Sequence, residues 1–125
     1  MARILLVEDN ADVERVLADF LRTLGHDVIT ASSAEEARHI TASARVSLAL
    51  IDCLMRGEQG DSLGEYISQL GVPTILTSGD PHYLETLGGR GLPFLPKPFR
   101  LGALEEVISR ILEANQGKQP GVANN

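Results

Sequence analysis

The sequence predicts an α/β protein in which helices cover both faces of a parallel sheet. Two observations carry this prediction. Short runs of branched apolar residues, as in strands buried on both faces, alternate with segments whose apolar residues recur every three or four positions, as in helices. The 125 residues, of which 43% are apolar and 22% charged, have the size and composition of one globular domain.

The first strand and the first helix are the most clearly marked elements. Residues 3–7 are a continuous apolar run that stops at a pair of acids. The helix that follows has apolar residues from Val13 to Leu24. Asn10 can cap its beginning and Gly25 can end it.

The second and third strand and helix pairs repeat this pattern. Residues 26–30 are read as a short strand, and Ser33 with Glu36 fits a capping box that opens the second helix. Residues 46–51 are a further buried strand, and residues 61–70 favour a helix after a loop.

The last part of the chain supplies two more strands and a closing helix. Residues 73–77 and 92–95 read as the fourth and fifth strands. Prolines on both sides of the fifth strand suit an edge of the sheet. Apolar residues at helical spacing from Leu101 to Leu112 predict the closing helix.

Two segments are expected to be less regular. Several glycines just before residue 92 make a long fourth helix unfavourable, so a helix at residues 81–87 is expected to be short or irregular. Residues 116–125 are polar and too few to build another domain. We therefore expect a single domain over residues 1–115 and a disordered tail.

Charge, cysteine content and hydropathy exclude several classes of protein. The net charge of −6, with no basic cluster, argues against direct nucleic-acid binding. Cys53 is the sole cysteine, which excludes an internal disulfide and predicts a buried structural thiol. No apolar run reaches the length of a membrane span or resembles a signal segment, so a cytoplasmic location without membrane contact is expected.

Polar residues gather at the ends of the predicted strands. Glu8 and Asp9 follow the first strand, Asp52 ends the third, and Ser78 and Lys97 follow the fourth and fifth. In an open parallel sheet, ligands bind outside the carboxyl ends of the strands. We therefore expect these three acids, one hydroxyl and one amine to meet at one edge of the sheet.

Three carboxylates in one place need a cation to offset their repulsion, which is about 4 kcal/mol per close pair at an effective dielectric constant near 20. Carboxylate oxygens, water and a phosphate group are the ligands that Mg²⁺ prefers. Lys97 supplies a second positive charge. Taken singly, each of these residues fits a helix cap, a turn or a solvated charge, and only their joint placement favours a site.

Together these residues resemble the receiver domain of two-component response regulators. The resemblance covers residues 3 to about 115 and includes the run Lys97-Pro98-Phe99. It implies a doubly wound, flavodoxin-like fold whose five parallel strands lie in the order 2-1-3-4-5. It also makes a cis bond between Lys97 and Pro98 more frequent than the base rate of about 5–6% for bonds before proline, without deciding the isomer.

The resemblance also implies the roles of the acids. Asp52 is the expected phospho-acceptor, and Glu8 with Asp9 is the expected acidic metal pair. Asp52 and the backbone carbonyl of Leu54 complete the expected ligand set for Mg²⁺ or Mn²⁺. Asp52 would attack a phosphohistidine and form an aspartyl phosphate.

Three further residues take roles by the same resemblance. Lys97 is the expected phosphate-binding lysine and Ser78 the switch hydroxyl. Phe94, three residues before Lys97, is the expected switch aromatic, which turns into the space that Ser78 leaves. Ser78 is preferred over Thr77 because it is followed by a small residue, Gly79, and lies at the family's distance from the strand-opening proline.

Some positions depart from the family pattern. Arg56 stands where the family usually has proline, which loosens its loop but removes no ligand. Leu54 and Asp80 lie at places near the path of the hydrolytic water in the family. We therefore expect this apolar and acidic pair to tune dephosphorylation.

The expected function is that of a single-domain response regulator in bacterial two-component phosphorelay signalling. The expected phosphoryl donor is a histidine kinase or histidine phosphotransferase. The surface of the fourth helix, the fifth strand and the last helix would then regulate a downstream protein, with a homodimer left open. The only expected catalysis is the protein's own phosphorylation and dephosphorylation, so it is not expected to be an enzyme.

Three other functions are considered. A flavin or nucleotide binder needs a loop that attracts phosphate after the first strand, where Glu8 and Asp9 would repel it. An aspartate-nucleophile phosphatase usually has a second acid two residues after the nucleophile, where Leu54 stands. An interaction module that keeps the fold and acts without phosphorylation is the remaining alternative.

Overall fold

Strands and helices alternate along the chain as the sequence predicts. The computed structural model describes residues 2–53, 60–79 and 93–118. Its elements are β1 (Arg3–Val7), α1 (Ala11–Thr23), β2 (Asp27–Ala31), α2 (Ala34–Ser43), β3 (Leu48–Asp52), α3 (Gly60–Gln69), β4 (Thr74–Ser78), β5 (Phe94–Pro96) and α5 (Leu101–Lys118). The fourth helix expected at residues 81–87 lies outside the described residues.

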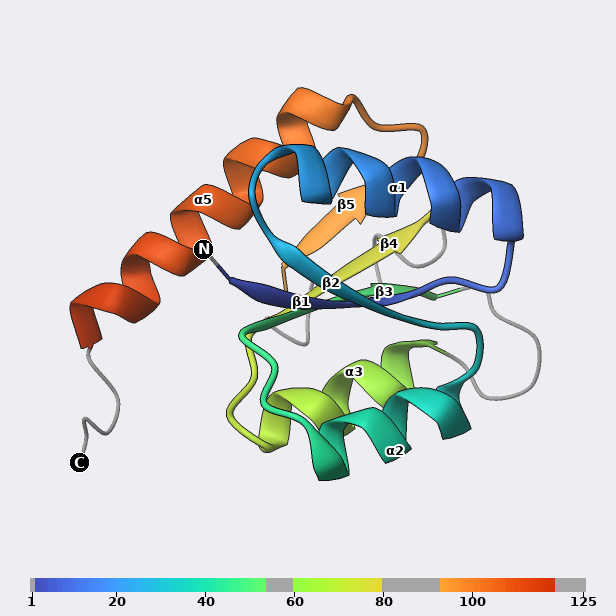
Figure 1. Cartoon of the computed structure of the whole chain (residues 1–125), viewed down its shortest axis with the longest axis vertical. Coiled ribbons are helices and arrows are strands. Elements are labelled where there is room, and N and C mark those ends of the chain that lie inside the picture. The colour runs from blue at the N-terminus through green and yellow to red at the C-terminus, as the bar shows by residue number, and fades with distance from the viewer. Residues whose placement is uncertain (1, 54–59, 80–92, 119–125) are drawn as a thin grey trace.

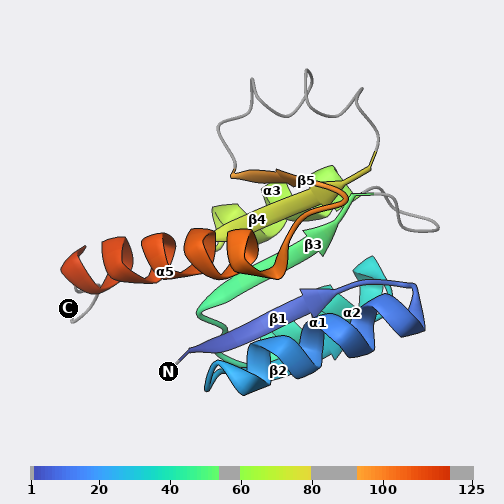
Figure 2. The ribbon, with the colours of Figure 1, turned by 90° about the horizontal axis from the view of Figure 1, so that it is seen from above.

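The five strands form one parallel sheet in the order β2-β1-β3-β4-β5, which confirms the expected doubly wound fold. Figure 2 shows the strands side by side in this order. β5 lies at one edge of the sheet, paired with β4 alone, as its flanking prolines predict.

Helices cover both faces of the sheet. α1 and α5 lie on one face, and α2 and α3 lie on the other (Figure 1). Each face has its own buried apolar cluster, one containing Leu17, Leu21 and Leu104 and the other containing Leu63 and Ile67. The parallel sheet is therefore buried on both sides, which explains the continuous apolar runs of its central strands.

Side chains of the central strands alternate between the two clusters. In β3, Leu48 and Leu50 pack toward α1 and α5, whereas Ala49 and Ile51 pack toward α2 and α3. Neighbouring residues in register on parallel strands share a face, so this alternation also sets the face of each polar residue at the strand ends.

The ends of α1 are built as the sequence predicts. The Asn10 side chain accepts hydrogen bonds from the backbone N–H groups of Asp12 and Val13, both at 3.0 Å. At the other end Gly25 has a φ of +95°, and the N–H of His26 donates to the Leu21 carbonyl at 3.2 Å. His26 belongs to this helix end, and β2 therefore begins one residue later than predicted.

The start of α2 is a variant of the predicted capping box. The Ser33 hydroxyl accepts from the N–H of Glu36 at 3.1 Å, as expected. The Glu36 carboxylate accepts from the N–H of Ser32 at 2.8 Å, one residue before the capping serine. Both bonds satisfy donors near the helix start that would otherwise lack a partner.

α5 extends further than the sequence indicates. The predicted tail begins at residue 116, but the helix continues to Lys118. Backbone hydrogen bonds within a helix do not require an apolar face, so a polar end can continue it. Among the helices described, none has the length and apolar character needed to cross a membrane.

Candidate functional site

The register of the sheet places two acids next to each other. Val7 of β1 pairs with Ile51 of β3, so Glu8 and Asp52, the next residues of these chains, lie side by side. By alternation from Leu6 and Leu50, both acids are on the face covered by α1 and α5.

The acidic cluster predicted from the sequence is present. Carboxylate oxygens of Glu8, Asp9 and Asp52 all lie within 4.8 Å of one another. The exposed fraction is 3% for Glu8 and 7% for Asp52, whereas Asp9 is half-buried. Two of the three carboxylates are therefore largely removed from water. Burying a charged group in this way is unfavourable.

Lys97 contacts both buried carboxylates. Its Nζ lies 3.3 Å from Glu8 Oε1 and 3.5 Å from Asp52 Oδ2. The backbone N–H of Lys97 donates to the Ser78 carbonyl at 2.8 Å, which holds the lysine at the end of β5. One cation thus connects the ends of β1, β3 and β5, in agreement with the prediction that Lys97 joins the acids.

Burial dominates the electrostatics of Glu8. Burial and then the charge of Asp52 raise the pKa of Glu8 from 4.5 to about 7. The Lys97 charge and the Asn10 N–H, at 3.4 Å from Glu8 Oε2, act in the opposite direction. A bound cation would favour the ionised carboxylate, so this residue is sensitive to whether a metal is present.

The donor set fits a hard divalent cation. It consists of carboxylate oxygens, without a nitrogen or sulfur ligand among the described residues of the cluster. Such ligands suit Mg²⁺ and Mn²⁺. The backbone carbonyl of Leu54, the remaining expected ligand, lies outside the described residues.

The two hydroxyls at the end of β4 lie on opposite faces of the sheet. Thr77 pairs with Asp52 and shares its face, whereas Ser78 alternates to the face of Leu76. Both are buried, with 3% and 1% of their surfaces exposed. Sequence reasoning located both at the strand end but could not assign their faces, because that requires the register between β3 and β4.

The remaining residues singled out in the sequence lie in different places. Phe94 is half-buried and packs against the cluster beneath α2 and α3. The Lys97–Pro98 peptide bond, whose isomer the sequence leaves open, is cis. Cys53 is buried, as predicted. Asp80 lies outside the described residues.

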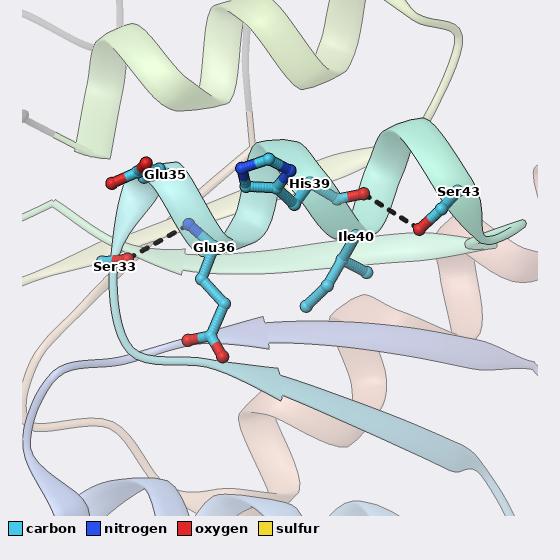
Figure 3. Close-up of a pocket in the computed structure, with 6 residues that line it drawn as sticks. All are labelled: Ser33, Glu35, Glu36, His39, Ile40 and Ser43. Atoms are coloured by element: carbon cyan, nitrogen blue, oxygen red, sulfur yellow. Dashed lines mark hydrogen bonds between the residues drawn. The ribbon is translucent and has the colours of Figure 1, made fainter.

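A shallow hollow of about 380 Å³ on α2 is lined by none of the three acids of the cluster (Figure 3). Its polar groups serve the helix itself. Ser33 accepts from the Glu36 N–H, and the Ser43 hydroxyl donates to the His39 carbonyl at 3.0 Å. These bonds indicate capping and local support, so we assign no chemistry to this hollow.

A larger and mainly apolar hollow of about 750 Å³ adjoins Lys97. It lies between α1 and the segment that joins β5 to α5. This hollow was not predicted from the sequence, in which Val16 reads as part of the apolar stripe of α1. In the structure Val16 is 57% exposed. The residues that line it are Asp12, Val13, Val16, Leu17, Gly79, Lys97, Pro98, Phe99 and Leu101.

Comparison with known sequences gives one consistent result. Residues 4–109 match the response regulator receiver domain. The probable transcriptional regulator ycf27 of Porphyra purpurea is 30% identical over 114 residues, which are 88% of this chain and 47% of that protein. PhoP, a virulence transcriptional regulatory protein of Salmonella typhimurium, is 30% identical over 99% of this chain and 56% of its own length. The chain thus spans about half the length of these curated relatives.

Comparison with solved structures agrees on the fold. The CheY-like receiver domain protein of Methanospirillum hungatei gives a TM-score of 0.86 at 24% identity, covering 94% of this chain and 98% of that one. The response regulator TrrA of Thermotoga maritima, solved in complex with Mg²⁺ and BeF, gives a TM-score of 0.82 at 27% identity. That alignment covers 90% of this chain and 100% of TrrA.

Glu8→Gln is expected to weaken metal binding and to raise the free energy of unfolding. The folded-state pKa of about 7 exceeds the ordinary 4.5. Between these pH values the folded state holds more protons than the unfolded state, so ionisation of Glu8 lowers the free energy of unfolding as pH rises. At pH 8 without metal, the variant should be more stable by about 1–3 kcal/mol. Its Mg²⁺ affinity should fall by about tenfold or more.

Denaturant unfolding and Mg²⁺ titration measure the two effects. Glu106→Gln is the matched control, since Glu106 is exposed on α5 and pairs with Arg110 at 3.5 Å. This exposed pair should contribute little. Equal stability of Glu8→Gln and the parent at pH 8, together with unchanged Mg²⁺ affinity, would show that Glu8 is not part of a metal site.

Proposed function

Because this chain belongs to the response regulator receiver family, we propose that Asp52 accepts a phosphoryl group from a phosphohistidine with Mg²⁺ bound beside it. Receiver domains are phospho-acceptor modules of two-component signalling rather than true enzymes, and they partner with histidine kinases. The proposal assigns the acceptor, the metal ligands and the phosphate-binding lysine to particular side chains of this chain.

The position of Asp52 is the observation that carries the proposal. Its carboxylate lies at the carboxyl end of the central strand, between Glu8 on one side and the Lys97 amine at 3.5 Å. A carboxylate that accepts a phosphoryl group needs positive charge close by, to compensate the negative charge of the phosphoryl oxygens. Among the described residues, this cluster is the one group of three acids able to hold a metal ion.

The proposed reaction is a phosphoryl transfer in line with the leaving imidazole. An oxygen of Asp52 forms a bond to phosphorus while the bond from phosphorus to the histidine nitrogen breaks. Lys97 neutralises charge on the transferring oxygens, which requires its amine to exchange the Glu8 contact for a phosphoryl contact. Bound Mg²⁺, held by Glu8, Asp9 and Asp52, would supply further charge neutralisation.

The proposed switch uses Ser78 and Phe94. The Ser78 hydroxyl starts on the face opposite to Asp52, so it must turn around the end of β4 to donate to the phosphoryl group. Phe94 is half-buried on the same face as Ser78 and can turn into the space that the hydroxyl leaves. The tuning of dephosphorylation by Leu54 and Asp80 stays a prediction from sequence.

The proposed output is a changed surface that regulates a partner protein. In the described part of the chain this surface includes β5 and α5, which carry Phe94 and the residues after Lys97. Magnesium is preferred over manganese as the resident ion because Mg²⁺ is typically held by one or two carboxylates and a phosphate.

The alternative function is that of a module that acts without phosphorylation. Such a module would bind neither Mg²⁺ with beryllofluoride nor phosphate.

The apolar hollow beside Lys97 is the proposed docking place of the phosphoryl donor. A phosphohistidine must reach Asp52 from the edge of the sheet where Lys97 lies. The hollow meets that edge and exposes Val16, at 57%, and Leu101, at 36%. Exposed apolar surface at the rim of a charged site favours contact with another protein.

The first test is phosphorylation of Asp52. We expect acetyl phosphate with Mg²⁺ to add the mass of one phosphoryl group to the parent, and we expect none on Asp52→Asn, which lacks the nucleophile. Asp19→Asn, an exposed change on α1, should be phosphorylated like the parent. Intact-mass spectrometry measures all three. The proposal would be defeated if the parent gained no mass, or if Asp52→Asn gained the same added mass as the parent.

The second test separates docking from chemistry. Val16→Arg should slow transfer from a phosphorylated histidine phosphotransferase by about fivefold or more, since it places a charge in an apolar contact. Phosphorylation by acetyl phosphate should be unchanged, because this small donor needs no docking surface. Leu70→Arg is the matched control, since Leu70 is 51% exposed and follows α3, before the amino end of β4, and does not line the hollow.

Rates of transfer from both donors are measured by rapid quench. If Val16→Arg slows both donors alike, the substitution perturbs the acceptor and not the docking surface. If it slows neither, the donor docks elsewhere.

A further inference from the structure

We propose that Thr77 is a positioning residue for Asp52: its hydroxyl donates a hydrogen bond to the Asp52 carboxyl group when that group carries a phosphoryl group. This inference rests on the proposed function. It concerns the hydroxyl that the sequence analysis set aside in favour of Ser78, and it gives the two adjacent hydroxyls separate tasks.

The register of the sheet carries the inference. Asp52 is the last residue of β3 and pairs directly with Thr77 of β4. Glu8 lies on the other side of Asp52, because the preceding residues Val7 and Ile51 are paired. Leu95 lies on the other side of Thr77. Glu8, Asp52, Thr77 and Leu95 therefore form one row across the sheet, facing α1 and α5.

The Thr77 hydroxyl is buried and lacks a partner in the described structure. The residue is 3% exposed, and among residues 2–53, 60–79 and 93–118 no hydrogen bond of its hydroxyl is found. Thr74, on the same strand and 2% exposed, instead donates to the Val72 carbonyl at 3.0 Å. A buried hydroxyl without a partner is unfavourable, and such groups in native proteins usually have a function.

Asp52 is the acceptor that the row offers. Leu95 in the row and Ile75, two residues back along β4, are apolar, and Lys97, which follows on the same face, is a donor rather than an acceptor. Side chains in register on adjacent strands are separated by about the strand spacing of 4.8 Å, so one rotation about χ1 can bring a threonine hydroxyl to a carboxyl oxygen.

Phosphorylation changes what Asp52 needs. In the structure, Asp52 Oδ2 is 3.5 Å from Lys97 Nζ. Once one Asp52 oxygen is bonded to phosphorus, the other oxygen of the carboxyl group remains an acceptor, and the buried Thr77 hydroxyl beside it is a donor without a partner among the described residues. A bond between them satisfies the Thr77 hydroxyl and fixes the orientation of the acyl phosphate.

Ser78 has a different place in the strand. It alternates to the face of Leu76, whereas Thr77 already lies beside the acceptor. Ser78 would bond the phosphoryl group and thereby change the surface near Phe94. Thr77 would bond the Asp52 carboxyl group that carries the phosphoryl group.

Beryllofluoride with saturating Mg²⁺ is the probe, and isothermal titration compares the parent with Thr77→Val, which keeps the shape and removes the hydroxyl. The expected loss of affinity is about threefold to tenfold, the effect of one hydrogen bond. Thr77→Ser restores the donor and should recover most of the affinity. Thr77→Ala repeats the deletion with a smaller side chain, in case valine distorts the strand.

Stability distinguishes positioning from a general effect on β4. Thr77→Val should unfold at the same or a higher denaturant concentration than the parent, because it removes a buried hydroxyl without a partner. Thr74→Val is the matched control. It loses the bond to Val72, so it should be less stable than the parent while binding beryllofluoride with unchanged affinity.

The outcomes separate this inference from the proposed function. A parent protein that binds no beryllofluoride overturns the proposed function and the inference with it. A parent that binds, with Thr77→Val binding equally well, overturns the inference alone. Equal losses of affinity in Thr77→Val and Thr74→Val, or no recovery in Thr77→Ser, would show that the hydroxyl is not the group that matters.

Discussion

The contact of Lys97 with Glu8 and Asp52 is the interaction on which the rest of the site depends. The sheet brings carboxylates of β1 and β3 into one buried place, where their repulsion is only partly screened. The amine, at 3.3 and 3.5 Å from them, compensates part of that charge, while burial and then the Asp52 charge still raise the pKa of Glu8. A divalent cation would complete the compensation, and the cation together with Lys97 could then contact the negatively charged oxygens of an arriving phosphoryl group, which is why this arrangement suits a phospho-acceptor.

The elements of the fold could be predicted because the central strands are buried on both faces and the helices on one. Those two patterns are visible in a single sequence. Boundaries were less accurate where local hydrogen bonds decide them. His26 reads as strand, but its N–H closes the end of α1. Residues 116–118 read as tail, but the backbone continues the helix.

For the site, residue type and order were readable, and spatial detail was not. The carboxyl ends of parallel strands share one edge of the sheet. The meeting of the residues at these ends could therefore be predicted, and these residues are Glu8, Asp9, Asp52 and Lys97. The faces of Thr77 and Ser78 depend on the register between β3 and β4, which no single strand contains. The hollow beside Lys97 depends on how α1 meets the segment before α5, again a tertiary property.

A structure of this protein with Mg²⁺ and beryllofluoride would test the central claim most directly. The account predicts beryllium bonded to an Asp52 oxygen, the metal on Glu8, Asp9 and Asp52, and Lys97 Nζ moved from Glu8 to a fluoride. Beryllofluoride bound away from Asp52, or a Lys97 amine still paired with Glu8 while the fluoride lies elsewhere, would contradict it.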